Sequence, residues 1–258
     1  MKAVILAGGK GTRLSEETHL RPKPMVEIGG RPILWHVMKI FSKYGINDFI
    51  ICTGYKGHMI KRYFAEYAMN SSDVTFSLLD NSTVIHSNPS ENWRVSVIDT
   101  GEETMTGGRL LRIKDYLEED TFMLTYGDGV SDVDLNKLIQ WHYKSECLAT
   151  LTAVRPPGRF GVVKFSEEDN YSIHSFDEKL DTNETWINGG FFVLDKGVFD
   201  YIKEGDQTIW EQEPLRGLAI DKKLCGYKHD GFWQPMDTLR DKNKLDFLCN
   251  GTGSPPWL

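Results

Sequence analysis

Blocks of apolar residues alternate with segments of helical spacing along the first part of the chain. Residues 3–7 form an apolar run, which predicts a strand that ends at Gly8. Apolar side chains then recur every three or four residues from Pro32, the expected first helical residue, until Gly45, and this predicts a helix. Residues 48–53 predict a buried strand, followed by an amphipathic helix. Such an order is typical of βαβ units in a mostly parallel sheet.

A further strand and helix are predicted in the middle of the chain, before the pattern changes. Residues 121–126 predict a strand that ends at the Gly-Asp-Gly of residues 127–129. Asp132 or Asp134 is expected to cap the helix that follows. From about Cys147 the apolar runs become shorter. The clearest strands there are 161–165, 172–176 and 187–194.

Together these elements predict one α/β domain over residues 1–258, without a linker or an internal repeat. We expect a Rossmann-like, mostly parallel mixed sheet flanked by helices, with a smaller β-rich subregion. Residues 1–146 are expected to form one half, and residues 147–258 the other half with a C-terminal helix, since helical spacing resumes at Thr238. Residues 71–92 are polar with strand-like pieces, and they fit either a hairpin or an interface arm.

Composition is typical of a globular protein. The 258 residues are 40% hydrophobic and 12% aromatic, which is enough for a sizeable core. Four cysteines, at positions 52, 147, 225 and 249, form no C-x-x-C pair, so we expect free thiols in a reducing compartment. No run approaches the ~18 apolar residues of a membrane span, and the N-terminus lacks a signal-peptide pattern. These features predict a soluble, cytoplasmic protein.

The segment after the first strand has the composition of a phosphate-binding loop. It contains Gly8, Gly9 and Gly11, and residues without a side chain let successive N–H groups point at one anion. The segment is not a P-loop, because Gly-Lys is not followed by Ser or Thr at the required spacing. It also departs from the dinucleotide fingerprint, because Leu14 stands in place of the third glycine. The glycines alone fit a tight strand-to-helix turn equally well.

Positive charges near the loop favour phosphate binding over a simple turn. Arg13 follows the glycines, and Lys23 lies between Pro22 and Pro24, which we expect to hold the backbone extended and so to define the reach of the ammonium group. The net charge of −7 argues against nucleic acid as a partner, because polyphosphate backbones are bound through an excess of Lys and Arg. An acidic protein that binds anions must concentrate its cations at the site or recruit a divalent metal.

The string GGKGTRL at residues 8–14, followed by PKPM at 22–25, resembles the opening of the sugar nucleotidyltransferases, and the resemblance extends over the chain. Three more segments resemble the branch of that family that uses CTP and glucose 1-phosphate: MTGGR at 105–109, PPGRFG at 156–161 and FWQPMDT at 232–238. The resemblance implies an enzyme that requires Mg²⁺ and forms a homo-oligomer, with a hexamer favoured. It also implies a role in the supply of dideoxysugars for a bacterial O-antigen.

The same resemblance implies roles for individual residues. Arg13 and Lys23 are expected to be catalytic, and Asp128 and Asp237 are expected to hold Mg²⁺, which prefers one or two carboxylates plus waters and phosphate oxygens. The expected nucleotide-binding residues are Leu6, Ala7, Gly8, Gly9, Lys10, Gly11, Thr12, Arg13, Lys23, Thr104 and Arg109. The expected sugar-phosphate-binding residues are Glu178, Lys179, Asn188 and Gly189.

Several of these positions also have a plainer explanation. Asp128 fits a turn before a helix, and Lys179 fits a solvated surface turn. Thr106 fits the cap of a helix as well as a base-recognition segment, in which glycine would free backbone groups for the base. Trp186 could stack on a hexose or belong to the core. Around Asp237 the chain has Pro and Asp where the wider family has Asp and Gly.

The expected reaction is nucleotidyl transfer, in which a phosphate oxygen of glucose 1-phosphate attacks the α-phosphorus of CTP in line and pyrophosphate leaves. The attacking phosphate is already ionised near neutral pH, so neither a protein nucleophile nor a general base is required. Three alternatives remain. One is the same reaction with UTP or dTTP, and another is a catalytically silent nucleotide-sugar-binding regulatory protein. The third is a nicotinamide oxidoreductase, which the missing third glycine disfavours.

Overall fold

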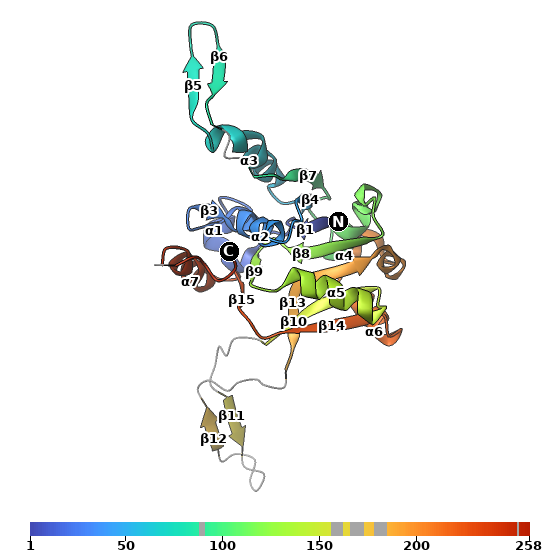
Figure 1. Ribbon diagram of the computed structural model, residues 1–258. Helices are drawn as coiled ribbons and strands as arrows, with labels where there is room; N and C mark the ends of the chain where they lie inside the picture. Colours follow the sequence, from blue (N-terminus) through green and yellow to red (C-terminus); the bar gives the residue numbers. More distant parts are fainter. Residues whose placement is uncertain (88–90, 156–161, 166–172, 178–184, 252) are drawn as a thin grey trace.

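The computed structural model shows a central β-sheet with helices on both faces and a hairpin that projects far from the body (Figure 1). It describes residues 1–87, 91–155, 162–165, 173–177, 185–251 and 253–258. Within this part of the chain, no helix is long and apolar enough to cross a membrane.

Seven strands form the main sheet, in the order β14-β10-β13-β8-β1-β4-β7. They are β1 (Lys2–Leu6), β4 (Asp48–Thr53), β7 (Arg94–Asp99), β8 (Thr121–Tyr126), β10 (Ala149–Val154), β13 (Ile187–Asp195) and β14 (Leu224–His229). All pairs are parallel except those of β13, which runs antiparallel to β8 and to β10. Every strand but β13 therefore ends at the same edge of the sheet. The predicted mostly parallel mixed sheet is confirmed.

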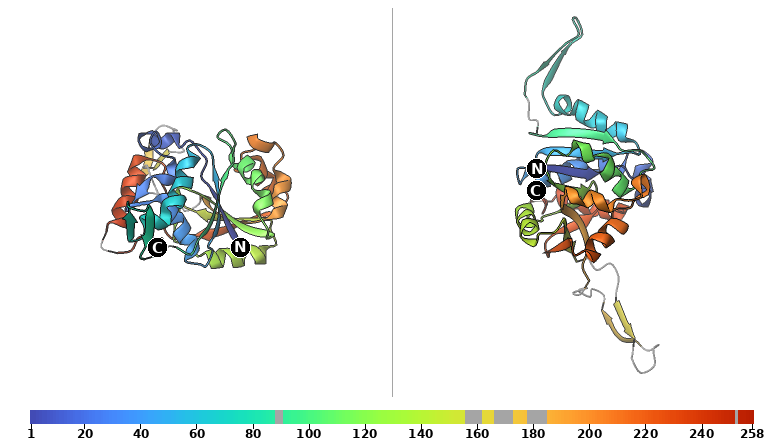
Figure 2. Two further views of the ribbon diagram at one scale, coloured as in Figure 1. Left: turned by 90° about the horizontal axis from the view of Figure 1, so that it is seen from above. Right: turned by 90° about the vertical axis from the view of Figure 1, so that its right-hand side faces the viewer.

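Helices cover both faces of the sheet, which Figure 2 shows between its two helical layers. They are α1 (Ser15–Thr18), α2 (Ile33–Ser42), α3 (Gly57–Asn70), α4 (Thr106–Arg112), α5 (Leu135–Ser145), α6 (Glu213–Ile220) and α7 (Leu239–Cys249). Alternate residues of β1 point to opposite faces: Ile5 packs with residues of α2, α3, α5 and α7, whereas Val4 and Leu6 pack with residues of α4 and α6. The sheet is thus buried on both sides, as a parallel sheet requires.

Shorter elements decorate this framework. The short 3₁₀ helices are η1 (Thr12–Leu14), η2 (Lys23–Met25), η3 (Lys114–Tyr116), η4 (Lys196–Tyr201) and η5 (Gly205–Gln207). The two-stranded sheets pair β2 (Glu27–Ile28) with β3 (Arg31–Pro32), β5 (Val74–Ser77) with β6 (Ser82–Ile85), β9 (Gly129–Ser131) with β15 (Trp233–Pro235), and β11 (Val162–Phe165) with β12 (Ile173–Asp177). The hairpin that projects at the top of Figure 1 is β5–β6, so the hairpin considered for this segment is present, and its use as an interface arm stays a prediction.

Some sequence predictions differ from the structure in detail. Pro32 lies in β3 and precedes α2, because its ψ of 142° is that of extended backbone. Asp134, not Asp132, caps α5, and its side chain accepts a hydrogen bond from the N–H of Lys137. The strands β7, β10 and β14 were not predicted. Two of them are edge strands with several polar residues, for which an apolar run is a weak signal.

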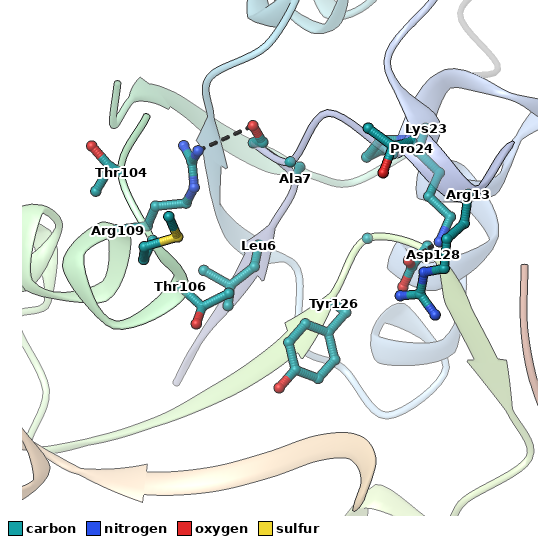
Figure 3. Close-up of a pocket in the computed structure, with 16 residues that line it drawn as sticks. Leu6, Ala7, Arg13, Lys23, Pro24, Thr104, Thr106, Arg109, Tyr126 and Asp128 are labelled. Carbon is teal, nitrogen blue, oxygen red and sulfur yellow. Dashed lines mark hydrogen bonds and ion pairs between the residues drawn. The ribbon is translucent and has the colours of Figure 1, made fainter. Parts of the chain in front are cut away.

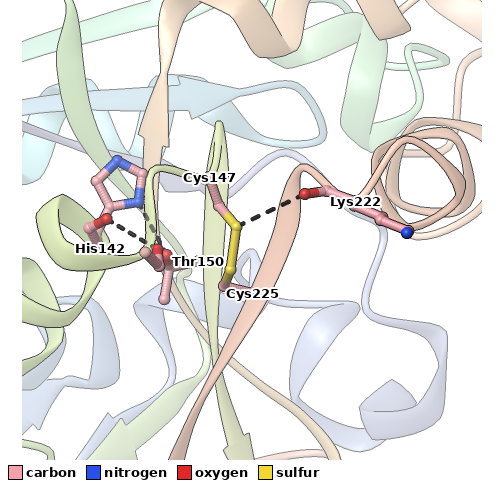
Figure 4. Close-up of a disulfide and its surroundings, with 6 residues drawn as sticks. His142, Cys147, Thr150, Lys222 and Cys225 are labelled. Atoms are coloured by element: carbon pink, nitrogen blue, oxygen red, sulfur yellow. Dashed lines mark hydrogen bonds between the residues drawn. A yellow bond between two sulfur atoms is a disulfide. The ribbon is translucent and has the colours of Figure 1, made fainter.

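The expectation that all four cysteines are free thiols is wrong for one pair. Cys147 and Cys225 form a disulfide, although 78 residues separate them (Figure 4). Cys147 lies just before β10, and β10 pairs with β14 so that Thr150 lies opposite Cys225. Spacing along the chain cannot show such a contact, because it arises from strand pairing. Cys52 and Cys249 are free. The thiols therefore no longer support a reducing compartment.

Candidate functional site

A cavity opens at the edge of the sheet where β1 and β8 end, and the segment that leads into α4 forms another of its walls. Its volume is about 370 Å³, and we call it the loop cavity. The lining residues are Leu6, Ala7, Gly8, Gly9, Gly11, Thr12, Arg13, Lys23, Pro24, Thr104, Met105, Thr106, Arg109, Tyr126, Gly127 and Asp128. These include every residue expected to bind a nucleotide except Lys10. Open parallel sheets place their ligands at this edge.

The glycine-rich loop presents backbone N–H groups to the loop cavity. Gly11 has a φ of 63°, and a Cβ there would lie 2.9 Å from the Thr18 methyl group, so a side chain is excluded. No described residue accepts a hydrogen bond from the N–H of Gly9, Lys10 or Thr12. Adjacent N–H groups without a protein acceptor form a concave site of positive potential. This backbone can therefore bind phosphate oxygens.

Arg109 holds the loop from behind. Arg109 is 4% exposed. Its guanidinium donates hydrogen bonds of 2.7 to 3.2 Å to five oxygens, namely the carbonyls of Thr53, Gly101, Gly8 and Glu102 and the Thr100 hydroxyl. Figure 3 shows the side chain reaching toward the loop after β1. A Cβ on Gly8 would lie 2.1 Å from Nη1, so glycine is required where the guanidinium packs. Burial lowers the pKa of Arg109. Both Nη groups are occupied by protein oxygens, so contact with a base stays a prediction for this residue.

Arg109→Met is expected to destabilise the protein by about 3 kcal/mol or more, because several buried carbonyls lose a charged donor. Urea-induced unfolding followed by circular dichroism measures the change. Arg112→Met is the control. Arg112 lies in the same helix and binds Asp206 at 2.6 and 2.8 Å, but both side chains are exposed, so little change is expected. Equal effects of the two substitutions would contradict this assignment of Arg109.

The glycines at the start of α4 have a structural partner. The N–H groups of Gly107 and Gly108 both donate to the carbonyl of Thr208, at 2.9 and 3.2 Å. A Cβ on Gly108 would lie 2.6 Å from the Cα of Asp206, so glycine permits the close approach of η5. The idea that these glycines free their backbone for a base is therefore wrong for their N–H groups. Thr106 is the first helical residue and does not cap the helix, because the cap position is Met105.

Two aspartates far apart in sequence meet at the mouth of the loop cavity. The pairing of β9 with β15 places Pro235 opposite Gly129, and the N–H of Met236 donates to the carbonyl of Asp128 at 2.8 Å. Asp237 follows directly, and its own N–H donates to the Asp241 carboxylate at 3.2 Å. Asp241 belongs to a capping box with Thr238 at the start of α7, which fixes this turn.

Lys23 lies between the two carboxylates. Its Nζ donates to Asp128 Oδ2 at 2.6 Å and to Asp237 Oδ1 at 2.8 Å, and its side chain is only 10% exposed. Burial lowers the pKa of Lys23, but the charges and hydrogen bonds of both carboxylates outweigh it, so the pKa is raised and the ammonium stays protonated. The backbone at Lys23 starts η2 after an extended Pro22, so the predicted extended conformation is wrong beyond Pro22.

Two other cations lie near this centre. Arg13 Nη1 donates to Asp237 Oδ2 at 2.9 Å, while its side chain is 74% exposed and free to reorient (Figure 3). Lys10 instead binds Glu103 at 2.6 Å outside the loop cavity. Its expected role in nucleotide binding stays a prediction.

The donor set at Asp128 and Asp237 fits a magnesium ion. Two carboxylates from different segments already converge on one cationic atom, and Mg²⁺ typically takes one or two carboxylates together with waters and substrate phosphates. Among the described residues, no group of three or more His, Cys, Asp or Glu side chains forms a closed metal cage. The arrangement is therefore suited to a metal that shares its ligands with a substrate.

A second, smaller cavity of about 50 Å³ adjoins the loop cavity, and Tyr126 and Asp128 line both. We call it the side cavity. Asn188 and Gly189, two of the expected sugar-phosphate-binding residues, line it, and the Gly189 carbonyl accepts a hydrogen bond from Trp233 Nε1 at 2.7 Å. The other two expected residues, Glu178 and Lys179, lie outside the described residues, as does the segment 156–161.

Sequence reasoning missed two residues here: Tyr126, which lines both cavities, and Glu211, which accepts hydrogen bonds from Thr106 and Tyr126. Tyr126 ends β8 and looked like an ordinary strand residue, and Glu211 lies in a loop that carries no motif. Only the place of Tyr126 at the carboxyl end of β8, two residues before Asp128, could have pointed to it. Trp186, considered for hexose stacking, has Arg155 at 4.8 Å and Lys228 at 5.2 Å from its ring centre, which favours a structural role.

Comparison with known proteins is consistent with this geometry. A family model described as nucleotidyl transferase matches residues 2–234. The chain is 54% identical to the glucose-1-phosphate cytidylyltransferase of Salmonella typhi, over 100% of this chain and 98% of the relative. It is 44% identical to the probable glucose-1-phosphate cytidylyltransferase of Bacillus subtilis, over 100% and 99%. The fold is similar to that of HddC from Yersinia pseudotuberculosis complexed with GMP-PN, with a TM-score of 0.67 and 23% identity over 95% of this chain and 97% of that one.

Proposed function

Because the chain belongs to the nucleotidyl transferase family, we propose that it transfers CMP from CTP to glucose 1-phosphate and so produces CDP-glucose and pyrophosphate. Full-length similarity to glucose-1-phosphate cytidylyltransferases supports this choice of substrates. The observation that carries the proposal is the position of Lys23, whose buried ammonium lies between two carboxylates beside the loop cavity. The N–H groups of the glycine-rich loop there have no acceptor in the described part of the chain. A silent binding protein has no need for this arrangement.

In the proposed reaction, a phosphate oxygen of glucose 1-phosphate forms a bond to the α-phosphorus while the bond to the pyrophosphate oxygen breaks. No proton has to move, so the residues act by alignment and by offsetting charge. Lys23 neutralises the α-phosphate, and Arg13 turns toward the leaving pyrophosphate, as its exposure permits. The loop N–H groups hold the other phosphate oxygens. Lys179, expected to fix the attacking phosphate, lies outside the described residues.

We propose Mg²⁺ as the cofactor, held by Asp128 and Asp237. The bound ion would withdraw charge from the transferring and leaving phosphates. Both carboxylates must then exchange part of their contact with Lys23 for the metal, which leaves the ammonium available to the α-phosphate. The acidic pair and the lysine thus serve the same anionic substrate.

The proposed function is tested by pyrophosphate release with each of CTP, UTP, dTTP and GTP, combined with a panel of hexose 1-phosphates. CTP with glucose 1-phosphate should give the highest kcat/KM. A higher kcat/KM with UTP or dTTP would show that the proposed base is wrong, although the proposed nucleotidyl transfer would still stand. Nucleotide binding without pyrophosphate release from any pair would favour the regulatory alternative.

We also propose that the protein forms a homo-oligomer, which the family resemblance implies with a hexamer favoured, and that the β5–β6 hairpin is its interface. The hairpin projects from the end of α3 and exposes Leu78 (90%), Leu79 (97%) and Phe76 (57%). An isolated two-stranded hairpin is marginally stable in water, and a cluster of exposed large apolar side chains is typical of an interface. A second copy of the chain is the partner proposed.

Leu78→Asp combined with Leu79→Asp is expected to lower the oligomeric state, because each introduces a charge into the apolar contact. Multi-angle light scattering measures the molar mass in solution. Ile220→Asp is the control, since Ile220 is similarly exposed, at 79%, but lies on α6 away from the hairpin. An unchanged mass of the double variant would show that the hairpin is not the interface.

Location in the cytoplasm and a role in O-antigen supply stay predictions.

A further inference from the structure

We propose that Glu211 is a positioning residue for both substrates, because its carboxylate joins the α4 segment at the loop cavity to the Asn188 amide at the side cavity. The inference rests on the proposed function, since it concerns the same pair of cavities. Glu211 lies in none of the motifs that the sequence singled out. The fold brings Glu211 together with Thr106, Tyr126 and Asn188, and hydrogen bonds join these four residues.

On the nucleotide side, Glu211 holds the start of α4. The Thr106 hydroxyl donates to Glu211 Oε2 at 2.7 Å, and the same hydroxyl oxygen accepts the N–H of Trp210 at 2.9 Å. The adjoining residue Met105 lines the loop cavity, as does Thr106 itself (Figure 3). The carboxylate therefore fixes the wall of the cavity against which a nucleoside would lie.

On the sugar side, Glu211 acts through Tyr126. The Tyr126 hydroxyl donates its one proton to Glu211 Oε1, so its oxygen can only accept from other groups. Asn188 Nδ2 is in position to donate to that oxygen, at 3.4 Å.

The direction of these hydrogen bonds orients the Asn188 amide. Its Oδ1 accepts the N–H of Gly190 at 2.8 Å, while one Nδ2–H points to Tyr126. The second Nδ2–H has no acceptor among the described residues, and Asn188 lines the side cavity. A fixed amide with one available N–H suits a sugar hydroxyl, because the donor is oriented before the ligand arrives.

A carboxylate is specifically required in this arrangement. Both neighbours of Glu211, the hydroxyls of Thr106 and Tyr126, donate to it, and only a carboxylate offers an acceptor oxygen to each. A glutamine has the same shape but one acceptor oxygen, so one hydroxyl must face its NH₂ group. Glu211→Gln therefore breaks one link or reverses its direction without creating a cavity.

Three substitutions distinguish the nucleotide side of this network from the sugar side. Each variant is assayed with the substrate pair that the wild type uses best. Thr106→Val is expected to raise the KM for the nucleotide about tenfold and to leave the KM for the sugar phosphate within twofold. Tyr126→Phe is expected to raise the KM for the sugar phosphate about tenfold and to leave the KM for the nucleotide within twofold. Glu211→Gln should raise both values, with kcat changed less than either KM. Adding Tyr126→Phe to Glu211→Gln should raise the sugar-phosphate KM by less than the product of the single effects.

Matched controls carry the same chemical change elsewhere. Glu213→Gln changes an exposed side chain two residues from Glu211. Tyr201→Phe removes a hydroxyl that donates to Asp221 at 2.8 Å. Both should leave each KM within twofold. The proposal is overturned if Glu211→Gln lowers the melting temperature but shifts neither KM, or if the effects of Glu211→Gln and Tyr126→Phe multiply fully. Failure of the proposed function would instead be seen in the wild type.

Discussion

Lys23→Met is expected to lower kcat by about 100-fold or more with CTP, glucose 1-phosphate and Mg²⁺ all saturating, as pyrophosphate release would show. Methionine keeps an unbranched side chain that is one atom shorter and removes the charge. Loss of that charge leaves the α-phosphate without its cation in a site where the ammonium is 10% exposed, so water replaces it poorly. Asp128 and Asp237 would also face each other without the ion that now lies between them.

Lys39→Met serves as the control for this substitution. Lys39 also forms a partly buried ion pair, with Glu91 at 2.9 Å, but it lines neither cavity, so kcat should stay within twofold. A Mg²⁺ titration of the free Lys23→Met protein adds a second readout. Binding should be no weaker than in the wild type, because a competing cation has been removed. A kcat near that of the wild type would contradict the role given to Lys23.

Asp128→Asn is expected to raise the Mg²⁺ concentration for half-maximal rate at least tenfold and to lower kcat/KM about 100-fold at fixed Mg²⁺. Asparagine keeps the shape and one carbonyl oxygen but removes the charge that attracts the metal. Part of the lost rate should return at high Mg²⁺, because Asp237 still offers a carboxylate. Initial rates measured across a MgCl₂ series give both quantities.

Asp48→Asn is the matched control for Asp128→Asn. Asp48 begins β4 at the opposite edge of the sheet and pairs with Arg94 at 3.6 Å, so it should not alter the Mg²⁺ dependence. If Asp128→Asn left the Mg²⁺ dependence unchanged, Asp128 would be a turn residue, as its place before β9 also permits. Chelation of the metal should abolish turnover in the wild type.

The centre also shows how a protein of net charge −7 can bind two anionic substrates. Lys23, Arg13 and Arg109 all lie around one cavity, and two of them are paired with carboxylates that a metal can share. In the proposed Mg²⁺ complex, these carboxylates would contact the metal in place of the cations. Lys23 and Arg13 would then be available to the substrate phosphates.

Much of the fold could be predicted from the sequence, because it rests on local patterns. The strand 48–53 and the helix from Ile33 follow from apolar periodicity, and Gly45 ends the helical run as expected. The strand β14 could not be predicted in this way, since Lys228 and His229 place polar residues in an edge strand. Its position is decided by pairing with β10, which is a non-local contact.

The same difference between local patterns and non-local contacts applies to the candidate site. The residues that line the loop cavity and belong to one segment, such as Gly8 and Gly11, were predicted from composition and spacing. Their geometry depends on Arg109, which reaches across from α4 to the carbonyl of Gly8 at 3.1 Å. Glu211 had no local signal, and it became visible only through its contacts with Thr106 and Tyr126.

The sequence by itself determined the alternation of strands and helices, the glycine-rich loop, and the presence of Lys23, Asp128 and Asp237. The tertiary structure alone decided that one ammonium lies between both carboxylates, that Cys147 meets Cys225, and that Glu211 links the two cavities. The physical reason is that backbone propensity and apolar periodicity act over a few residues, whereas these contacts join segments that come together only when the sheet assembles.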